Sequence, residues 1–216
     1  FTVPTGNFGD IFAAYVAKKM GLPIDKLIIA TNENDILHRA LTSGVYSKKD
    51  LKKTFSPSMD IQVASNFERL FYDLNDRNGV ETKVMMEKLA MEGKFKIKPK
   101  IMTRFKEFFS SGMVSEADTL GTISNIFSSK GLLICPHTAV GICVAERYLA
   151  EMDKIPTVSL ATAHAAKFPE AVIKATTMNP ELPPKYKDLF TRTEHFTNVG
   201  NNLEEVEMLI KERVFI

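Results

Sequence analysis

Short, continuously apolar segments alternate with amphipathic helical patterns along this chain. The apolar segments are residues 26–31, 132–135 and 157–161, and each has the length of a buried strand. A strand that is apolar on both faces must be covered on both faces, as in a parallel sheet between two layers of helices. The sequence therefore predicts an α/β fold, a three-layer αβα sandwich with a mainly parallel sheet.

Helical spacing, with its start and stop signals, predicts the elements that lie between these strands. Asn34 and Ser115 are expected to cap helices, and Gly21 and Gly44 to end them. Residues 95–97 read as an edge strand. The predicted helices cover residues 10–20, 35–43, 66–74, 80–92, 100–109, 116–129 and 137–152.

These patterns suggest how the chain is divided. With 216 residues, of which 44% are hydrophobic, it can build one sizeable core, or a core with an excursion. Residues 80–129 are rich in helical patterns and hold hardly any strand. We therefore expect residues 1–79 to form the first part of an α/β domain, residues 80–129 a mostly helical excursion, and residues 130–216 the rest of the domain and a C-terminal tail.

Charge and hydropathy argue against nucleic-acid and membrane partners. The formal net charge is only +2, and Glu87, Glu92 and Glu107 lie near the basic residues that cluster within residues 94–106, so we interpret the cluster as a solvated helix face. An apolar stretch long enough to span a bilayer is not present in the sequence, and a cytoplasmic protein is the default expectation. The clustered residues are Lys94, Lys96, Lys98, Lys100, Arg104 and Lys106.

The two cysteines, Cys135 and Cys143, match no metal-ligand or redox spacing. A strand-to-helix junction is predicted between them. We expect both to be reduced and buried, and we predict no metal site.

Residues 4–10, with the sequence PTGNFGD, form a glycine-flanked turn between a short apolar segment and a helix. Gly6 and Gly9 allow the backbone to approach a ligand closely, and the amides of residues 7–10 gather at a helix N-terminus, where positive partial charge concentrates. A phosphate can dock there without lysine or arginine. The pattern is neither G-x-G-x-x-G nor a P-loop, and a plain strand-to-helix connection is the alternative.

Three further loops accompany this turn. Residues 136–141 include His137, for which a capping or packing role is favoured over a catalytic one. Residues 162–170 begin with Thr162, whose hydroxyl is able to donate a hydrogen bond to a ring nitrogen of a flat ligand, although a capped strand end is the alternative. Residues 56–69 are polar and poor in glycine, which is also typical of an Asn-capped helix entry. Because each loop follows an apolar segment, we expect all of them to converge on one rim of the sheet.

The order and separation of these segments resemble one family. The chain is similar to the C-terminal half of threonine synthases, pyridoxal-phosphate (PLP) enzymes of the tryptophan-synthase-β fold type, known as fold type II. The resemblance covers nearly the whole chain. The segments that carry it are VPTGNFGD (residues 3–10), ATNENDIL (30–37), SPSMDI (56–61), SNFERL (65–70), PHTAVG (136–141) and ATAHAAKFP (161–169).

The resemblance implies a cofactor site and a reaction. Thr162 would face the pyridine nitrogen. Because its hydroxyl is neutral, it would not hold that nitrogen protonated, and the cofactor ring would withdraw electrons less strongly. The family converts O-phospho-L-homoserine and water into L-threonine and phosphate, the last step of threonine biosynthesis. It does so by removing protons from Cα and Cβ, eliminating the γ-phosphate and adding water at Cβ. The residues that would hold the cofactor's 5′-phosphate are Gly6, Asn7, Phe8, Gly9 and Asp10.

The resemblance does not include the lysine that forms the Schiff base with the cofactor. In the family the Schiff-base lysine precedes the glycine loop, so the N-terminal half of the enzyme is expected to be absent, and no catalytic residue is assigned in this chain. Lys167 matches an ordinary Ala-Lys-Phe-Pro segment, and we expect it to point into the structure. The chain alone is then an inactive part of an enzyme. A threonine-synthase-like phospho-ligand lyase or binding protein is the alternative, and the substrate-phosphate ligands and the choice between monomer and homodimer stay open.

Overall fold

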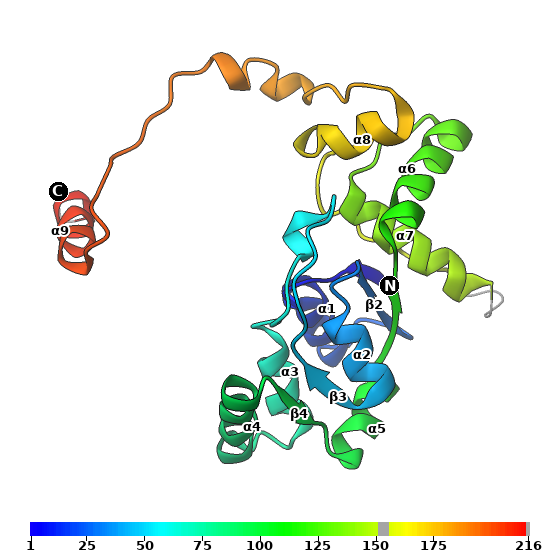
Figure 1. Cartoon of the computed structure of the whole chain (residues 1–216), viewed down its shortest axis with the longest axis vertical. Helices are drawn as coiled ribbons and strands as arrows, with labels where there is room; N and C mark the ends of the chain where they lie inside the picture. Colours follow the sequence, from blue (N-terminus) through cyan, green and yellow to red (C-terminus); the bar gives the residue numbers. More distant parts are fainter. Residues whose placement is uncertain (151–155, 215–216) are drawn as a thin grey trace. The chain divides into compact units, whose positions relative to one another are not determined.

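A computed structural model describes residues 1–150 and 156–214 (Figure 1). They form two compact units, Phe1–Pro180 and Glu181–Ile216. The first unit contains a three-stranded parallel sheet, in which β2 (Leu27–Thr31) lies between β1 (Thr2–Pro4) and β5 (Phe109–Met113). A separate antiparallel pair joins β3 (Val45–Ser47) to β4 (Lys94–Lys96), so the edge strand predicted at residues 95–97 is confirmed.

The central strand β2 is buried on both faces, as predicted for a parallel sheet. Leu27 and Ile29 belong to the larger apolar core, which α1, α2, α3 and α5 share. Ile28 and Ala30 point to the opposite face, where they pack with Val140 of α7. Helices therefore cover both faces of a small parallel sheet, and the predicted α/β class is confirmed.

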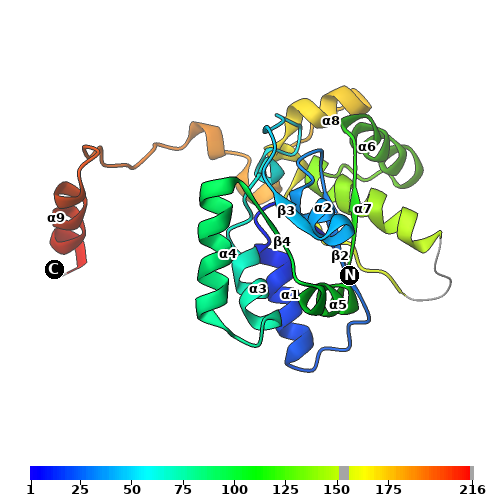
Figure 2. The ribbon, with the colours of Figure 1, turned by 60° about the horizontal axis from the view of Figure 1, so that its bottom comes forward.

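The helices occur where the sequence predicts them, with ends that agree to within about one residue. The exception is residue 152, which lies outside the described residues. Figure 2 shows α1, α3 and α4 lying side by side, and in Figure 1 α6, α7 and α8 form a second group. Helices α8 and α9 were not predicted. The bounds are α1 Gly9–Lys19, α2 Ile36–Ser43, α3 Phe67–Leu74, α4 Gly79–Glu92, α5 Pro99–Phe108, α6 Glu116–Lys130, α7 Pro136–Leu149, α8 Pro169–Thr176 and α9 Leu203–Val214.

The ends of the helices show which of the predicted capping residues are correct. Ser115 caps α6 by accepting a hydrogen bond from the Asp118 amide at 3.2 Å, and Gly44 ends α2 in the left-handed conformation with φ of 73°. The predicted cap at Asn34 is wrong, because Asp35 occupies the N-cap of α2. The Asn34 side chain instead takes part in a buried hydrogen-bond network that is described below.

The strand predicted at residues 132–135 does not form. Leu132 is 59% exposed, and Ile134 packs against a small core that contains Ile123 and Ala171, from α6 and α8. Helices rather than a neighbouring strand cover this apolar run. A short run of this kind does not by itself reveal which of the two will cover it.

The strand predicted at residues 157–161 is reduced to one bridge, in which Ser159 pairs with Thr2 in parallel orientation. The Thr2 amide donates to the Val158 carbonyl at 2.8 Å, and the Leu160 amide donates to the Thr2 carbonyl at 3.0 Å. Because β1 is only three residues long, it offers little backbone for a longer ladder. The segment nevertheless lies along the outer edge of β1, as a fourth parallel strand would.

Strand β5 lies inside residues 80–129 and was not predicted. Its sequence FSSGM is weakly β-forming, and its pairing with β2, from Leu27↔Phe109 to Thr31↔Met113, supplies the order that local propensity lacks. The segment that was expected to be mostly helical thus returns to the sheet once. The proposed division into residues 1–79, 80–129 and 130–216 stays a prediction.

The basic cluster of residues 94–106 spans β4 and α5, so the predicted helix face holds only for Lys100, Arg104 and Lys106. Lys98 forms an ion pair with Glu81, and both Lys100 and Arg104 bond Asp76, at 2.7 and 2.6 Å. Much of the positive charge is thus balanced within the fold by acids that are distant in sequence.

The second unit contains η3 (Pro184–Tyr186), η4 (Leu189–Thr191) and α9. Several of its large apolar side chains, among them Phe190 and Leu203, are exposed. Among the helices that the structure describes, none has the length and apolar character needed to cross a bilayer. The cytoplasmic location stays a prediction.

Candidate functional site

A cavity of about 370 Å³ lies where β1 ends and the glycine turn begins. This is the edge at which parallel sheets place their ligands, beyond the carboxyl ends of the strands. Four separate segments meet around it, and all six predicted cofactor residues are among them. The lining residues are Pro4, Thr5, Gly6, Asn7, Phe8, Gly9, Asp10, Ser58, Met59, Asn66, His137, Thr162, Ala163, Lys167 and Phe168.

Phe8 sets the shape of the turn. It occupies the N-cap of α1 with φ of 67°, a left-handed conformation that is uncommon for a residue with a side chain. Its ring is 1% exposed and packs edge-to-face on Phe67, with 5.4 Å between centroids. This packing holds the strained backbone in place. No side chain caps α1, so the amides of its first turn are free to receive an anion at the positive end of the helix.

The two glycines of the turn differ in what surrounds them. A Cβ on Gly6 would lie 2.8 Å from the Met59 Cα and 2.9 Å from the Ser58 carbonyl oxygen, so the chain itself requires glycine there. A Cβ on Gly9 would meet only the Asn66 amide nitrogen, at an ordinary 3.5 Å. Gly6 therefore allows two backbone segments to pack, whereas the space beside Gly9 is left open at the cavity.

Asn7 ties the turn to the start of α3. Its side-chain oxygen accepts hydrogen bonds from the Ser65 amide at 2.6 Å and the Ser65 hydroxyl at 2.7 Å. Its carbonyl accepts from the amide and the side chain of Asn66, at 3.2 and 3.1 Å. The Ser65-Asn66-Phe67 segment thus acts as a clamp on the turn, a role that sequence analysis did not assign to it.

His137 forms part of the cavity wall and is 4% exposed. Its Nε2 accepts a hydrogen bond from the Ser58 amide at 3.2 Å, which leaves the proton on Nδ1. Burial, together with the nearby positive charge of Lys167, lowers the pKa of His137 to about 4. The imidazole is therefore neutral near pH 7 and its Nε2 lone pair is occupied. Its position agrees with the packed role favoured from the sequence.

A buried polar network holds Ser58 and Met59 in position. The Asp60 carboxylate accepts hydrogen bonds from the side chains of Asn32 at 2.8 Å, Asn34 at 2.9 Å and Thr54 at 2.6 Å. Asn32 directly follows β2, and Asp60 directly follows the short 3-10 helix η1 (Pro57–Met59). The network thereby fixes η1 to the end of the sheet.

Thr162 and Lys167 bring the fourth segment to the cavity. Thr162 is exposed and lies in the cavity lining with the other predicted site residues, and its role there stays a prediction. The prediction that Lys167 points into the structure is wrong, because this side chain is exposed and lines the cavity. Its ammonium lies 5.8 Å from the centroid of the Phe168 ring. Lys167 ends the short 3-10 helix η2 (Ala165–Lys167), for which the sequence carries no simple signal.

Convergence of the loops is confirmed, since residues of all four lie around one cavity. Sequence analysis did not assign Ser58, Asn66 or Phe168 to the site. All three lie in segments that it had singled out, so the sequence indicated the segments but not these individual residues. The individual side chains are selected by packing, which no local pattern reveals.

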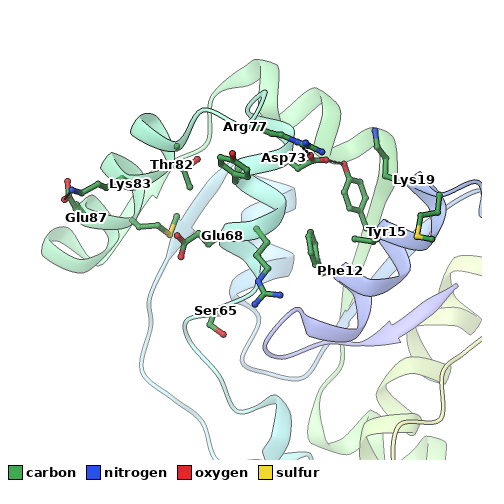
Figure 3. A pocket seen from close by; sticks show the side chains of 16 residues that line it. Phe12, Tyr15, Lys19, Ser65, Glu68, Asp73, Arg77, Thr82, Lys83 and Glu87 are labelled. Atoms are coloured by element: carbon green, nitrogen blue, oxygen red, sulfur yellow. Dashed lines mark hydrogen bonds and ion pairs between the residues drawn. The ribbon is translucent and has the colours of Figure 1, made fainter.

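A larger cavity of about 940 Å³ lies between α1, α3 and α4 (Figure 3). Two pairs of its charged groups, Arg77 with Asp73 and Lys83 with Glu87, satisfy one another. Tyr15 donates to Asp73 at 2.7 Å, and Arg77 donates to the same carboxylate at 3.1 Å. Size alone therefore does not make it the better candidate, because the glycine turn and the other singled-out loops meet at the smaller cavity.

The cysteines fit their predicted role. Cys135 and Cys143 are both free and buried, and the Cys135 sulfur accepts a weak hydrogen bond from the Thr138 amide at the start of α7. In residues 1–150 and 156–214, no group of three or more His, Cys, Asp or Glu side chains is arranged to hold a metal ion.

Comparison with known proteins agrees with the family resemblance seen in the sequence. Residues 138–210 match a family model described as threonine synthase, C-terminal. The curated threonine synthase of Pseudomonas aeruginosa is 45% identical over 98% of this chain and 45% of its own length. The crystal structure of PLP-bound threonine synthase from Brucella melitensis superposes with a TM-score of 0.87, at 46% identity over 98% of this chain and 45% of that one. Over nearly its whole length the chain matches part of known threonine synthases.

The match covers only part of each relative. The threonine synthase of Saccharomyces cerevisiae is 48% identical over 81% of this chain and 37% of its own length. The chain thus spans about half the length, or less, of the threonine synthases it matches, and it corresponds to a C-terminal part of them.

Proposed function

We propose that the cavity at the end of β1 binds pyridoxal 5′-phosphate, with the phosphate at the amides of residues 7–10 and the pyridine nitrogen at Thr162. The observation that carries this proposal is the meeting of the uncapped start of α1 and the Thr162 hydroxyl at one cavity. Its volume, about 370 Å³, is in the range typical of small-molecule sites. The PLP-bound relative from Brucella melitensis supports the choice of ligand.

The residues present suit this group. An anion at the start of α1 is stabilised by the helix dipole and by free amides, so the phosphate needs no cation there. The open space beside Gly9 leaves room for the phosphate against the backbone. A neutral hydroxyl at Thr162 donates a hydrogen bond to the ring nitrogen without holding it protonated.

We further propose that the protein of which this chain is a part is a threonine synthase. It converts O-phospho-L-homoserine and water into L-threonine and phosphate, and it is thus a PLP-dependent carbon–oxygen lyase. The cofactor, when bound, supplies an electron sink for charge that develops at the substrate's Cα and Cβ. The described residues bind and orient it. The turn anchors its anionic end, and Phe168 and the neutral His137 form a wall that limits access of water.

This chain alone is proposed to be inactive. Lys167 is the only lysine that lines the cavity in the described part of the chain, and the family resemblance places the cofactor-binding lysine before the glycine turn. The alternative is a threonine-synthase-like protein without synthase activity. The name threonine synthase, carried by each of the three relatives described above, favours the synthase.

The test is phosphate release from O-phospho-L-homoserine by the full-length protein that contains this chain, with Thr162→Val. This change removes the hydroxyl at nearly constant volume, so kcat should fall by about tenfold or more while PLP affinity changes by less than about threefold. Thr103→Val is the matched control, because Thr103 lies on α5 and bonds only its own helix, at the Pro99 carbonyl. An unchanged kcat in Thr162→Val, or no phosphate release by the unmodified protein, would overturn the proposal.

A further inference from the structure

Lys167 is the only lysine or arginine that lines the candidate site within the described residues. It ends η2, five residues after Thr162, and the next residue, Phe168, is also in the cavity wall. Its ammonium faces the Phe168 ring at 5.8 Å from the centroid, which is compatible with a weak cation–π contact. The structure thus brings a positive charge to a cavity whose glycine turn needs none.

This charge has no counter-ion in the described part of the chain. Lys98 and Lys100, by contrast, pair with carboxylates. The only acidic residue in the lining is Asp10, which lies in the first turn of α1 and forms no ion pair with a described residue. A cation at a cavity wall without a protein partner is suited to bind an anionic ligand.

His137 lies in the same cavity wall as Lys167. Burial lowers the pKa of His137, the Asp60 carboxylate raises it and the Lys167 ammonium lowers it, so both charges act on the imidazole. The Asp60 carboxylate is held by Asn32, Asn34 and Thr54 and does not line the cavity. His137 is neutral there, and the Ser58 amide beside it donates to Nε2. Neither group neutralises Lys167. An anion drawn to this side of the cavity is therefore left with Lys167 as its cationic partner.

Two phosphates must be held apart in the reaction that the preceding subsection proposes. One belongs to the cofactor and the other to the substrate, and like charges that share one site repel. We propose that Lys167 binds the phosphate of an amino-acid phosphate monoester, while the glycine turn holds the phosphate of the cofactor. This inference rests on the proposed function for the identity of the first phosphate, but not for the presence of an anion site at Lys167.

The experiment is calorimetric titration of the full-length protein that contains this chain, prepared without PLP, with O-phospho-L-homoserine and, separately, with PLP. Lys167→Met should weaken O-phospho-L-homoserine binding by about tenfold or more, since a charge-assisted contact is lost, and should change PLP affinity by less than about twofold. Lys167→Arg should retain most of the affinity for the phosphate monoester. Lys174→Met is the matched control, because Lys174 also lies over a phenylalanine ring, that of Phe55 at 4.8 Å, but outside the cavity lining.

The outcomes separate this inference from the proposed function. If PLP does not bind but O-phospho-L-homoserine binds in a Lys167-dependent way, the anion site stands and the cofactor site fails. An equal loss of affinity for both ligands in Lys167→Met would assign Lys167 to the cofactor phosphate and overturn the inference. It would also be overturned by no measurable binding of O-phospho-L-homoserine, by an unchanged affinity in Lys167→Met, or by borohydride reduction with PLP that labels Lys167 covalently.

Discussion

Gly6 and Gly9 both flank the turn, yet the residues around them predict different consequences of substitution. Gly6→Ala forces a Cβ to 2.8 Å from the Met59 Cα, so the free energy of unfolding should fall by about 1–3 kcal/mol. Gly9→Ala meets only an ordinary 3.5 Å contact, so stability should change by less than about 1 kcal/mol, while PLP affinity falls because the added methyl group occupies the open space.

Urea unfolding and PLP titration of the two variants separate these effects. Equal losses of stability would show that the backbone around Gly9 is as crowded as that around Gly6. Unaltered PLP affinity in Gly9→Ala would place the phosphate elsewhere.

His137 should make stability depend on pH in a defined window. Its folded pKa of about 4 lies below the ordinary value of 6.5, so the unfolded state binds the proton more readily. The resulting stabilisation is complete above about pH 6.5 and is lost as pH falls toward 4, with a total of about 3 kcal/mol.

An NMR titration of the His137 ring measures this pKa directly, and comparison with His137→Gln isolates its share from that of His38, whose pKa burial also lowers. A His137 pKa near 6.5, or pH profiles that run parallel in the two proteins, would contradict this account.

Among the elements, η1 depends on the Asp60 network for its position. Asp60→Ala leaves the buried side chains of Asn32 and Asn34 without their shared acceptor, so the free energy of unfolding should fall by about 3 kcal/mol. Asp50→Ala is the control, because Asp50 is exposed and its carboxylate takes part in no hydrogen bond or ion pair with a described residue. Thermal unfolding measures both variants. Equal stability of the two would show that the network contributes little.

The sequence predicted the helices well because their capping and 3.6-residue periodicity are local. It failed at β5, whose sequence is weakly β-forming and whose order comes from pairing with β2. It also failed at residues 132–135, where α6 and α8 cover an apolar run that has no neighbouring strand. The partner that orders β5 is distant in sequence, and so is α8, one of the two helices that cover residues 132–135.

At the scale of the whole molecule, the balanced charge predicts no affinity for nucleic acid. Lys98, Lys100 and Arg104 form ion pairs, and the formal net charge is +2. Fluorescence anisotropy with a labelled duplex should show no binding at about 0.15 M salt. Binding that weakens steeply as salt rises would indicate an exposed basic surface and contradict this view.

The candidate site was predictable as a set of segments but not as a set of side chains. Parallel strands place the loops that follow them at one edge, so the meeting of the glycine turn with the Thr162 loop follows from topology. The place of Lys167 in the lining does not, because Lys167 ends the 3-10 helix η2, which the sequence did not predict. The clamp of Ser65 on Asn7 likewise depends on contacts between distant segments.

The central claim is that the phosphate of PLP binds at the start of α1 and its ring reaches Thr162. The most direct test is an amide NMR titration of the 216-residue chain with PLP, which follows every assigned backbone amide at once. We predict that the largest shifts occur at Gly9, Asp10 and Thr162, and that Gly9→Ala weakens all three together. Shifts confined to the cavity between α1, α3 and α4, or shifts at Thr162 without any at Gly9 and Asp10, would contradict the claim.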